Sequence, residues 1–371
     1  MSVIVDQLDA ARQRTLDLLA PFDDGFLSAQ HSPLMSPLAW DLAHIGNYED
    51  QWLVRALGAD GVGAHLDELY DAFRHPRADR PMLPLLSPAE AHAYVADVRE
   101  RALTLLDHEG VRPSHPHLLD DGFVYGMVIQ HEHQHDETML ATIQLSGARG
   151  DTGGGPRPAR AGEMELIEGG TFVLGTSTES WAYDNERPAH DVVVPPFWID
   201  TAPVSNGAYA AFIADGGYDD ERLWHRDGWA WRTDEQARAP LFWHKDESVL
   251  RFGAHVPRVA DEPVQHVCWY EADAFARWAG RRLPTEAEWE KATPHHAGEV
   301  WEWTSSSCTG WPGFKSFPYR EYSEVFFGST YKVLRGGSWA THAPAIRPTF
   351  RNWDYPIRRQ IFAGFRCARD A

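Results

Sequence analysis

The stretch Val124-Tyr-Gly-Met-Val-Ile-Gln-His131-Glu-His-Gln-His135-Asp-Glu-Thr-Met-Leu140 decides how the first half of the chain folds. A helix has about 3.6 residues per turn, so residues spaced by three or four positions share one face. That face carries Val124, Val128, His131, His135, Met139 and Ile143. Two neutral imidazoles one turn apart can chelate a metal, and each keeps a second ring nitrogen for an orienting hydrogen bond. The stretch therefore predicts a buried, metal-binding helix.

Two other interpretations of this helix stay open. Both histidines are also compatible with a core position in which neighbouring polar groups satisfy the imidazoles. The letters His131-Glu-His-Gln-His135 also spell the His-Glu-x-x-His pattern of zinc proteases, in which Glu132 is the general base. A third ligand has to be found before the metal site is distinguished from either alternative.

Composition and charge limit the class of protein. A chain of 371 residues, 43% of them hydrophobic, is long for one core and predicts two globular domains. The net charge of -20 comes from 54 acidic and 34 basic residues, which makes nucleic acids and anionic membranes poor partners and favours small molecules. The sequence has neither a signal-type apolar core nor an apolar span of about 20 residues. The sequence does not indicate the oligomeric state.

The cysteines point to a reducing compartment. Cys268, Cys308 and Cys367 are far apart in the sequence and form no metal-type pair. We therefore expect a cytoplasmic location.

Residues 1–145 read as a four-helix bundle. The first helix is expected at 3–20 and the second from an N-cap at Ser36 to Leu57, with Pro37 in its first turn. A capping box, Ser87-Pro-Ala-Glu90, opens a third helix that runs to about Leu106, and the histidine helix is the fourth. Bundles build metal sites from facing helices, so His44 on the second helix is the candidate third ligand. Imidazoles alone suit zinc, iron, copper or nickel.

Residues 146–162 have the composition of a flexible linker, and residues 163–371 read as an α+β domain. We expect strands in 165–174 and 191–199, helices in 205–214 and 271–279, and a helix after the capping box formed by Thr285 and Glu288. Pattern alone assigns no function to this second domain.

Both domains resemble known families. Glu168-Gly-Gly-Thr-Phe-Val-Leu-Gly175, Leu283-Pro-Thr-Glu-Ala-Glu-Trp289, Val300-Trp-Glu-Trp-Thr304, Arg335-Gly-Gly-Ser-Trp339 and Gly364-Phe-Arg-Cys-Ala368 resemble the formylglycine-generating-enzyme-like domain, a variant of the C-type lectin fold. Residues 1–145 resemble the DinB-like four-helix domain with its three-histidine metal site. The resemblance covers nearly the whole chain and implies a protein with these two domains in this order.

The combination resembles the iron-dependent sulfoxide synthases of ergothioneine biosynthesis, the EgtB family, in its actinobacterial type. The similarity is strongest in Trp40-Asp-Leu-Ala-His44, His131-Glu-His-Gln-His135, Phe317-Pro-Tyr-Arg-Glu-Tyr322 and Phe350-Arg-Asn-Trp-Asp-Tyr-Pro-Ile-Arg358. It implies Fe(II) held by His44, His131 and His135. It also implies a reaction in which O2 is used to join the sulfur of γ-glutamylcysteine to hercynine, a trimethylated histidine, as a sulfoxide.

The same resemblance implies roles for residues that bind these substrates. Asn352 and Trp353 would hold the hercynine trimethylammonium group, which an indole face attracts, and Gln134 would bond its imidazole. Arg80, Asp354 and Arg358 would bind the carboxylates and ammonium of γ-glutamylcysteine. The resemblance also implies an active-site tyrosine, for which alignment favours Tyr319; a phenol with a pKa of about 10 stays protonated until it donates. Tyr322, the other candidate, is placed among the substrate-binding residues.

The chain departs from the family at one place, and several alternatives remain. Between Ala292 and Glu299 only six residues stand where relatives carry a longer segment, and a calcium site there is in doubt. The cysteine pair by which formylglycine-generating enzymes bind copper is not matched by Cys308 and Cys367. Within the family, cysteine or a selenium donor is the alternative to γ-glutamylcysteine, and histidine to hercynine. Outside it, a zinc hydrolase, a DinB-type thiol transferase and a lectin-like binding module are the rivals.

Overall fold

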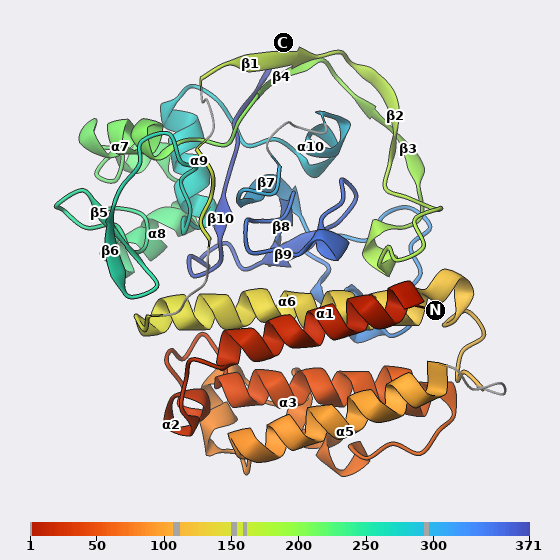
Figure 1. Ribbon diagram of the computed structural model, residues 1–371. Helices are drawn as coiled ribbons and strands as arrows, with labels where there is room; N and C mark the ends of the chain where they lie inside the picture. The colour runs from red at the N-terminus through yellow and green to blue at the C-terminus, as the bar shows by residue number, and fades with distance from the viewer. Residues whose placement is uncertain (1, 107–111, 150–153, 159–161, 293–296) are drawn as a thin grey trace. The chain divides into compact units, whose positions relative to one another are not determined.

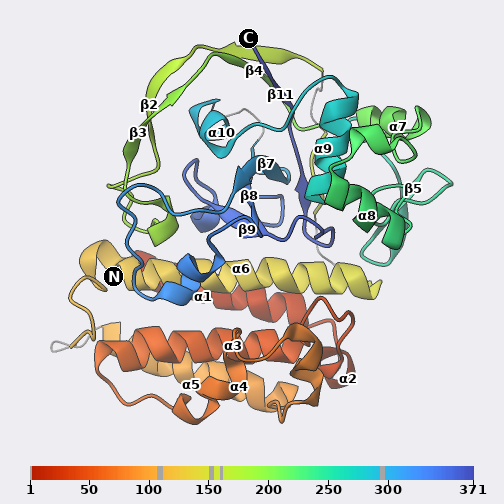
Figure 2. The same ribbon diagram turned by 180° about the vertical axis from the view of Figure 1, so that it is seen from behind.

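A computed structural model describes residues 2–106, 112–149, 154–158, 162–292 and 297–371 of the protein (Figures 1 and 2). The chain divides into two compact units, Met1–Thr152 and Gly153–Ala371, and each is described by itself. The boundaries expected at residues 145 and 162 stay a prediction, because part of the expected linker lies outside the described residues. Within that linker, the Arg157 guanidinium bonds the Glu299 carboxylate of the second unit, with Nε 2.7 Å from Oε1. None of the helices among the described residues is long and apolar enough to cross a membrane.

The first unit is helical, as expected. In the part of this unit that the structure describes, four long α-helices lie alongside one another (Figure 1), and two short α-helices stand in the connections. Their bounds are α1 Ser2–Leu19, α2 Asp24–Ser28, α3 Leu38–Glu49, α4 Asp67–Tyr70, α5 Pro88–Leu106 and α6 Phe123–Ser146. Helix α3 continues as a π-helical turn, Asp50–Val54, and a 3-10 turn, Arg55–Leu57, so the expected end of the second helix at Leu57 is confirmed.

One expected cap is wrong and another is confirmed. The N-cap of α3 is Pro37 rather than Ser36, and no side chain caps the helix. The Ser36 hydroxyl instead accepts a hydrogen bond of 2.6 Å from Arg80 Nη1. At α5 the capping box is present, because the Ser87 N–H bonds the Glu90 carboxylate at 2.8 Å and the Glu90 N–H bonds the Ser87 hydroxyl at 3.3 Å.

A buried ion network joins the four long helices, with one member from each: Arg12 of α1, Glu49 of α3, Arg99 of α5 and Glu132 of α6. Arg12 lies 2.6 Å from Glu49 and 2.7 Å from Glu132, and Arg99 lies 2.5 Å from Glu49 and 3.1 Å from Glu132. Two positive and two negative charges balance in an interior where an unpaired charge costs several kcal/mol. The network therefore links all four helices through buried side chains.

The second unit contains four small sheets and four α-helices among the described residues. The sheets have the strand orders β1-β4-β11, β10-β7-β8-β9, β2-β3 and β5-β6. The strands are β1 Met164–Ile167, β2 Gly170–Leu174, β3 His190–Val194, β4 Phe197–Asp200, β5 Ser248–Arg251, β6 Ala254–Pro257, β7 Trp301–Ser307, β8 Lys332–Arg335, β9 Asn352–Asp354, β10 Ala363–Gly364 and β11 Ala368–Asp370. The helices are α7 Asn206–Ala214, α8 Arg226–Asp234, α9 Trp269–Trp278 and α10 Glu286–Ala292.

The expected α+β class of this unit is confirmed, with three corrections. Each expected strand is two strands: 165–174 breaks before Gly170, and 191–199 breaks at Pro195-Pro196, where prolines cannot donate to a ladder. Helix α8 was missed. The expected capping box at α10 is confirmed, with the Thr285 N–H 2.7 Å from the Glu288 carboxylate.

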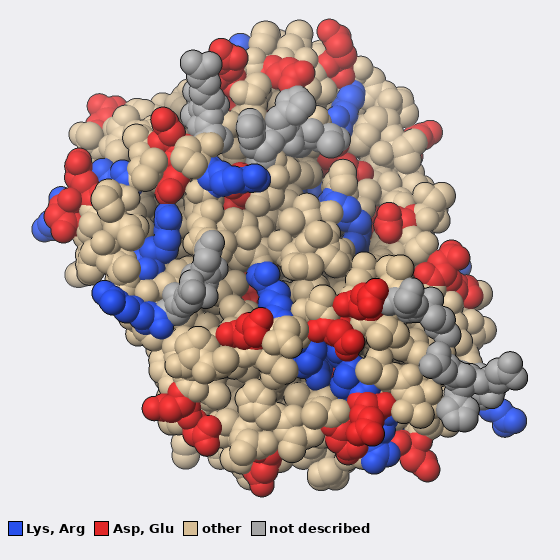
Figure 3. Space-filling model, viewed as in Figure 1, with Lys and Arg blue, Asp and Glu red and all other residues tan. Residues whose placement is uncertain are grey.

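Buried charge pairs also organise the second unit. Arg366 lies 2.6 Å from Glu302 of β7, and Arg351 lies 2.8 Å from Glu286 of α10. On the face shown in Figure 3, acidic and basic side chains are interspersed.

Candidate metal centre and substrate-binding residues

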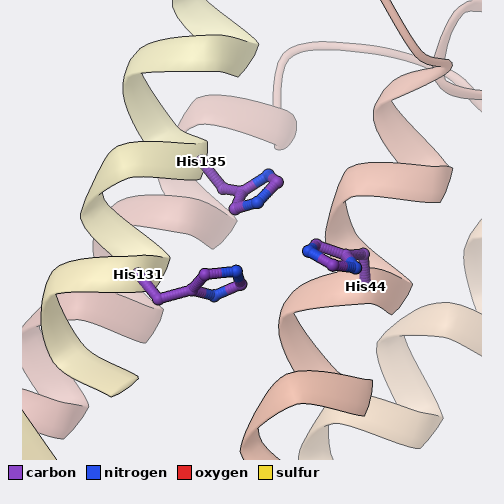
Figure 4. A group of neighbouring side chains, drawn as sticks. All are labelled: His44, His131 and His135. Carbon is purple, nitrogen blue, oxygen red and sulfur yellow. The ribbon is translucent and has the colours of Figure 1, made fainter. Parts of the chain in front are cut away.

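Three histidines of the first unit converge (Figure 4). His131 and His135 come from successive turns of α6, and His44 faces them from α3. One ligand atom from each residue lies within 4.8 Å of the other two. The ring centroids are 5.1 Å apart for His44 and His131, and 4.6 Å apart for each of the other two pairs. The triad expected from helical spacing and from the bundle pattern is therefore present.

Hydrogen bonds orient two of the three rings. His44 Nδ1 lies 2.7 Å from the backbone oxygen of Tyr70, and His135 Nδ1 lies 3.1 Å from Asp41 Oδ1. Both partners accept hydrogen bonds, so each Nδ1 carries the proton and each Nε2 keeps its lone pair. His131 is held by stacking on Tyr48, with ring centroids 3.7 Å apart.

The surroundings keep the imidazoles of His44 and His131 neutral. Burial, followed by the neighbouring His135, lowers the pKa of His44 well below its usual value. Burial also lowers the pKa of His131, with contributions from His135 and His44. Neutral imidazoles are the form that binds a metal. Three convergent imidazole nitrogens, with hydrogen bonds that orient the rings of His44 and His135, fit a divalent transition metal.

Arg80 stacks on Trp40, which separates its guanidinium from the His44 ring of the triad. Its guanidinium stacks 3.6 Å from the ring centre of Trp40, and Trp40 in turn stacks on His44 at 4.7 Å. Arg80 is 4% exposed and donates to the Ser36 hydroxyl and to the Ala72 backbone oxygen. Burial lowers the pKa of Arg80 to about 10. That Arg80 binds a substrate carboxylate stays a prediction.

Glu132 faces away from the triad, into the ion network between the helices. Its carboxylate accepts bonds from Arg12, Arg99 and the Thr15 hydroxyl. Burial would raise the pKa of Glu132, but Arg12 and Arg99 outweigh it and hold the pKa below its usual value. A carboxylate so occupied is no general base for a metal-bound water, and the zinc-protease alternative loses its catalytic residue.

The second unit brings several predicted site residues together. Tyr319 and Tyr322 are in edge contact, with ring centroids 6.3 Å apart, and Tyr322 meets Trp353 edge-on at 5.9 Å. Tyr183, which sequence analysis missed, stacks on Tyr322 at 4.1 Å. All four aromatic rings therefore form one connected cluster.

The other predicted residues lie on or beside β9. Asn352, Trp353 and Asp354 form that strand, and Arg358 lies 3.6 Å from Asp354 Oδ1. All are partly exposed. Gln134, in the first unit, precedes His135 on α6 and is also partly exposed. Their substrate-binding roles stay predictions.

Three residues of the site escaped sequence analysis: Asp41, Tyr48 and Tyr183. Asp41 and Tyr48 flank His44 on α3 at helical spacings of three and four residues, so a search for polar and aromatic residues around each ligand would have found them. Tyr183 is more than a hundred residues from Tyr322 in the sequence and carried no local signal.

Comparison with known families accounts for both units. The DinB superfamily matches residues 7–139, and the sulfatase-modifying factor enzyme 1-like domain matches residues 151–296 and 294–371. The expected fold class is thereby confirmed. The second match consists of two pieces that meet at residues 294–296, inside the segment expected to be shortened. Residues 293–296 of that segment lie outside the described part of the chain.

Curated relatives cover the whole chain. A hercynine oxygenase from Mycolicibacterium smegmatis is 46% identical over 430 aligned positions, which cover 99% of this chain and 98% of the relative. The hercynine oxygenase of Mycobacterium tuberculosis is 46% identical over 427 positions, covering 98% and 97%. The formylglycine-generating enzyme of Streptomyces coelicolor is 29% identical over 314 positions, covering 63% of this chain and 97% of that one. The resemblance drawn from the sequence motifs is confirmed: the chain belongs to the hercynine oxygenase family and is an oxidoreductase enzyme.

Proposed function

We propose that this enzyme is an Fe(II)- and O2-dependent sulfoxide synthase that joins γ-glutamylcysteine to hercynine in ergothioneine biosynthesis. The observation that carries the proposal is the convergence of His44, His131 and His135, with ligand atoms within 4.8 Å, in a member of this family. In the overall reaction the C2–H bond of hercynine and the S–H bond of the thiol break, and a C–S and an S–O bond form. O2 accepts four electrons and leaves one oxygen in the sulfoxide and one in water.

The three histidines would hold the iron, which supplies the one-electron chemistry that O2 needs to react with a thiol and an imidazole. The chain's own contribution is a set of neutral nitrogen donors. Asp41 and the Tyr70 carbonyl fix the tautomers of His135 and His44. Because the donors carry no charge, an anionic thiolate substrate meets no repulsion from them.

The second unit would bind the organic parts of the substrates. The indole of Trp353 offers a face to the hercynine trimethylammonium group, an attraction of about 2 kcal/mol when desolvated. Asp354 would pair with the ammonium of γ-glutamylcysteine, and Arg358 with a carboxylate. These two side chains already lie 3.6 Å apart, so they suit a ligand that carries both charges on one carbon.

Tyr319 would deliver a proton or hydrogen atom to the oxygen being reduced, and so direct oxidation toward C–S bond formation. Without that donor, O2 is expected to add both oxygens to the thiol, giving a sulfinate. We therefore expect Tyr319→Phe to shift the product from sulfoxide toward sulfinate. An unchanged product ratio would remove Tyr319 from this role.

The function is tested by anaerobic reconstitution with Fe(II), addition of hercynine and γ-glutamylcysteine, and then exposure to air. Mass analysis should find one sulfoxide-linked product per O2 consumed. Replacing γ-glutamylcysteine by cysteine tests the sulfur donor, and a faster reaction with cysteine would favour the alternative donor. No O2 uptake with any of these pairs would overturn the proposal.

A further inference from the structure

A buried turn of the second unit, Tyr183–Glu186, contacts both segments that carry predicted site residues. Its side chains are nearly inaccessible, between 0% and 3% exposed. Residues 184–186 form a 3-10 turn, so successive side chains point in different directions. None of these residues carries a role in the function proposed above.

Asp184 holds the two ends of the loop that contains Tyr319 and Tyr322. Its Oδ2 accepts a bond of 3.1 Å from the Phe317 N–H, and its Oδ1 accepts a bond of 2.7 Å from the Ser323 hydroxyl. Ser323 is fully buried. One carboxylate therefore spans the loop and fixes the distance between its ends.

Tyr183 acts on the middle of the same loop. Its ring stacks on Tyr322 with centroids 4.1 Å apart and planes 20° from parallel. Tyr322 in turn meets the edges of Tyr319 and Trp353. The stack therefore leaves the Tyr322 ring little freedom to rotate away from Tyr319.

The remaining residues of the turn, Asn185 and Glu186, form hydrogen bonds with the segment that immediately precedes β9. The Glu186 carboxylate accepts bonds of 2.7 Å from Arg347 Nε and from the Thr349 hydroxyl. The Asn185 amide donates to the Arg351 backbone oxygen at 3.4 Å. The strand that carries Asn352, Trp353 and Asp354 thus begins from residues held by the same turn.

We propose that Tyr183 and Asp184 are positioning residues that hold the phenols of Tyr319 and Tyr322 in one arrangement for the oxidation step. This inference rests on the proposed donor role of Tyr319. A misplacement of about 1 Å in a catalytic group costs up to roughly a hundredfold in rate, so an anchor at both ends of the loop has a catalytic effect.

The charge of Asp184 supports this assignment. Burial, with a smaller contribution from the Glu324 carboxylate, raises the pKa of Asp184 to about 6 against the opposing effect of the Ser323 and Phe317 bonds. An ionised carboxylate in this buried site lowers the free energy of unfolding at neutral pH. Such a loss of stability is expected of a group that is retained for its positioning role.

Hydrogen exchange of the full-length protein tests the anchor without relying on activity. In Asp184→Ala, and less in Asp184→Asn, the peptide containing Phe317 and Ser323 should exchange faster than in the wild type. The matched control is Asp200→Asn, because Asp200 is also buried, accepts a backbone N–H from Cys367 at 2.9 Å, and is remote in sequence from the loop. It should leave exchange of the loop unchanged. Unchanged loop exchange in both Asp184 variants overturns the proposal.

Product analysis then tests the catalytic consequence. With the iron-loaded enzyme, Asp184→Ala should lower kcat, with KM for both substrates little changed, and shift the product toward sulfinate. Asp184→Asn should restore part of the sulfoxide. If Asp184→Ala does not fold, Ser323→Ala removes one of the two anchors and should shift both readouts in the same direction.

The two proposals fail in different ways. If Tyr319→Phe changes the product ratio while the Asp184 variants loosen the loop without changing the ratio, the positioning role is overturned and the sulfoxide synthase proposal stands. If Tyr319→Phe leaves the ratio of sulfoxide to sulfinate unchanged, the donor role of Tyr319 is wrong. The positioning role of Tyr183 and Asp184 is then also wrong, even where hydrogen exchange shows that the loop is anchored.

Discussion

His135 Nδ1 lies 3.1 Å from Asp41 Oδ1, so a carboxylate on α3 orients an imidazole of the histidine triad on α6. The corresponding nitrogen of His44 bonds a backbone oxygen, that of Tyr70. A side-chain substitution can therefore remove the orienting group of one histidine and leave that of the other in place.

Asp41→Ala should weaken metal binding without removing a ligand. Loss of such an orienting partner typically lowers metal affinity by about 10–100-fold, because the imidazole is free to rotate and becomes less basic. Anaerobic titration of metal-free protein with Fe(II) or Co(II) measures the effect. Asp97→Ala, an exposed residue of α5 paired with Arg101, is the control. Equal affinities in the two variants would contradict the orienting role.

His131→Ala should abolish stoichiometric metal binding, whereas His133→Ala should retain it. The two histidines are both buried on α6, but His133 bonds Asp136 at 3.2 Å and does not join the triad. Metal content after reconstitution, measured by elemental analysis, distinguishes them. His133→Ala is expected to lose stability rather than metal. Metal loss in both variants would show that the triad is not the site.

Glu132→Gln should destabilise the first unit by roughly 3–5 kcal/mol, because it leaves the buried Arg12 and Arg99 with one countercharge fewer. Urea unfolding followed by circular dichroism measures the change. Glu100→Gln, an exposed residue next to Arg99 in the sequence, should change stability by less than about 0.5 kcal/mol. A Glu132→Gln variant as stable as the wild type would refute the ion network as an energetic element.

Stability should depend on pH through Asp184. Burial raises its pKa from 3.8 to about 6, so between about pH 4 and pH 6 the folded state keeps a proton that the unfolded state loses. This contribution is fully present below about pH 4 and is lost as pH rises through 6. Relative to Asp184→Asn, the wild type should therefore lose up to roughly 3 kcal/mol of unfolding free energy across this window. Urea unfolding of both proteins at pH 4.5 and pH 7 measures it, and a constant difference would contradict the raised pKa.

The His131–His135 pair of the triad was predictable from sequence because its signal is local. Helical periodicity places His131 and His135 on one face, and the bundle pattern brings His44 opposite them. The capping boxes at Ser87 and Thr285 were predictable for the same reason, since a cap involves residues only three positions apart.

Two predictions were wrong because contacts with residues distant in the sequence outweighed the local signal. Ser36 is a good N-cap residue, but its hydroxyl is taken by Arg80, which follows it by 44 residues. The apolar runs at 165–174 and 191–199 read as single strands, whereas each supplies strands to two different sheets. Apolar content predicted strands here but neither their burial, since Val173 and Val193 are exposed, nor where along each segment the chain changes partners.

By itself, then, the sequence determined the four long helices of the first unit, their apolar faces and the residue types able to bind a metal, because these depend on spacings of a few residues. Only the tertiary structure decided that Glu132 belongs to an ion network rather than to catalysis, that Asp41 orients His135, and that Tyr183 and Asp184 hold the Tyr319 loop. Those contacts join residues roughly 90 to 140 positions apart, and a pairing over such distances depends on how whole elements pack, which no local pattern encodes.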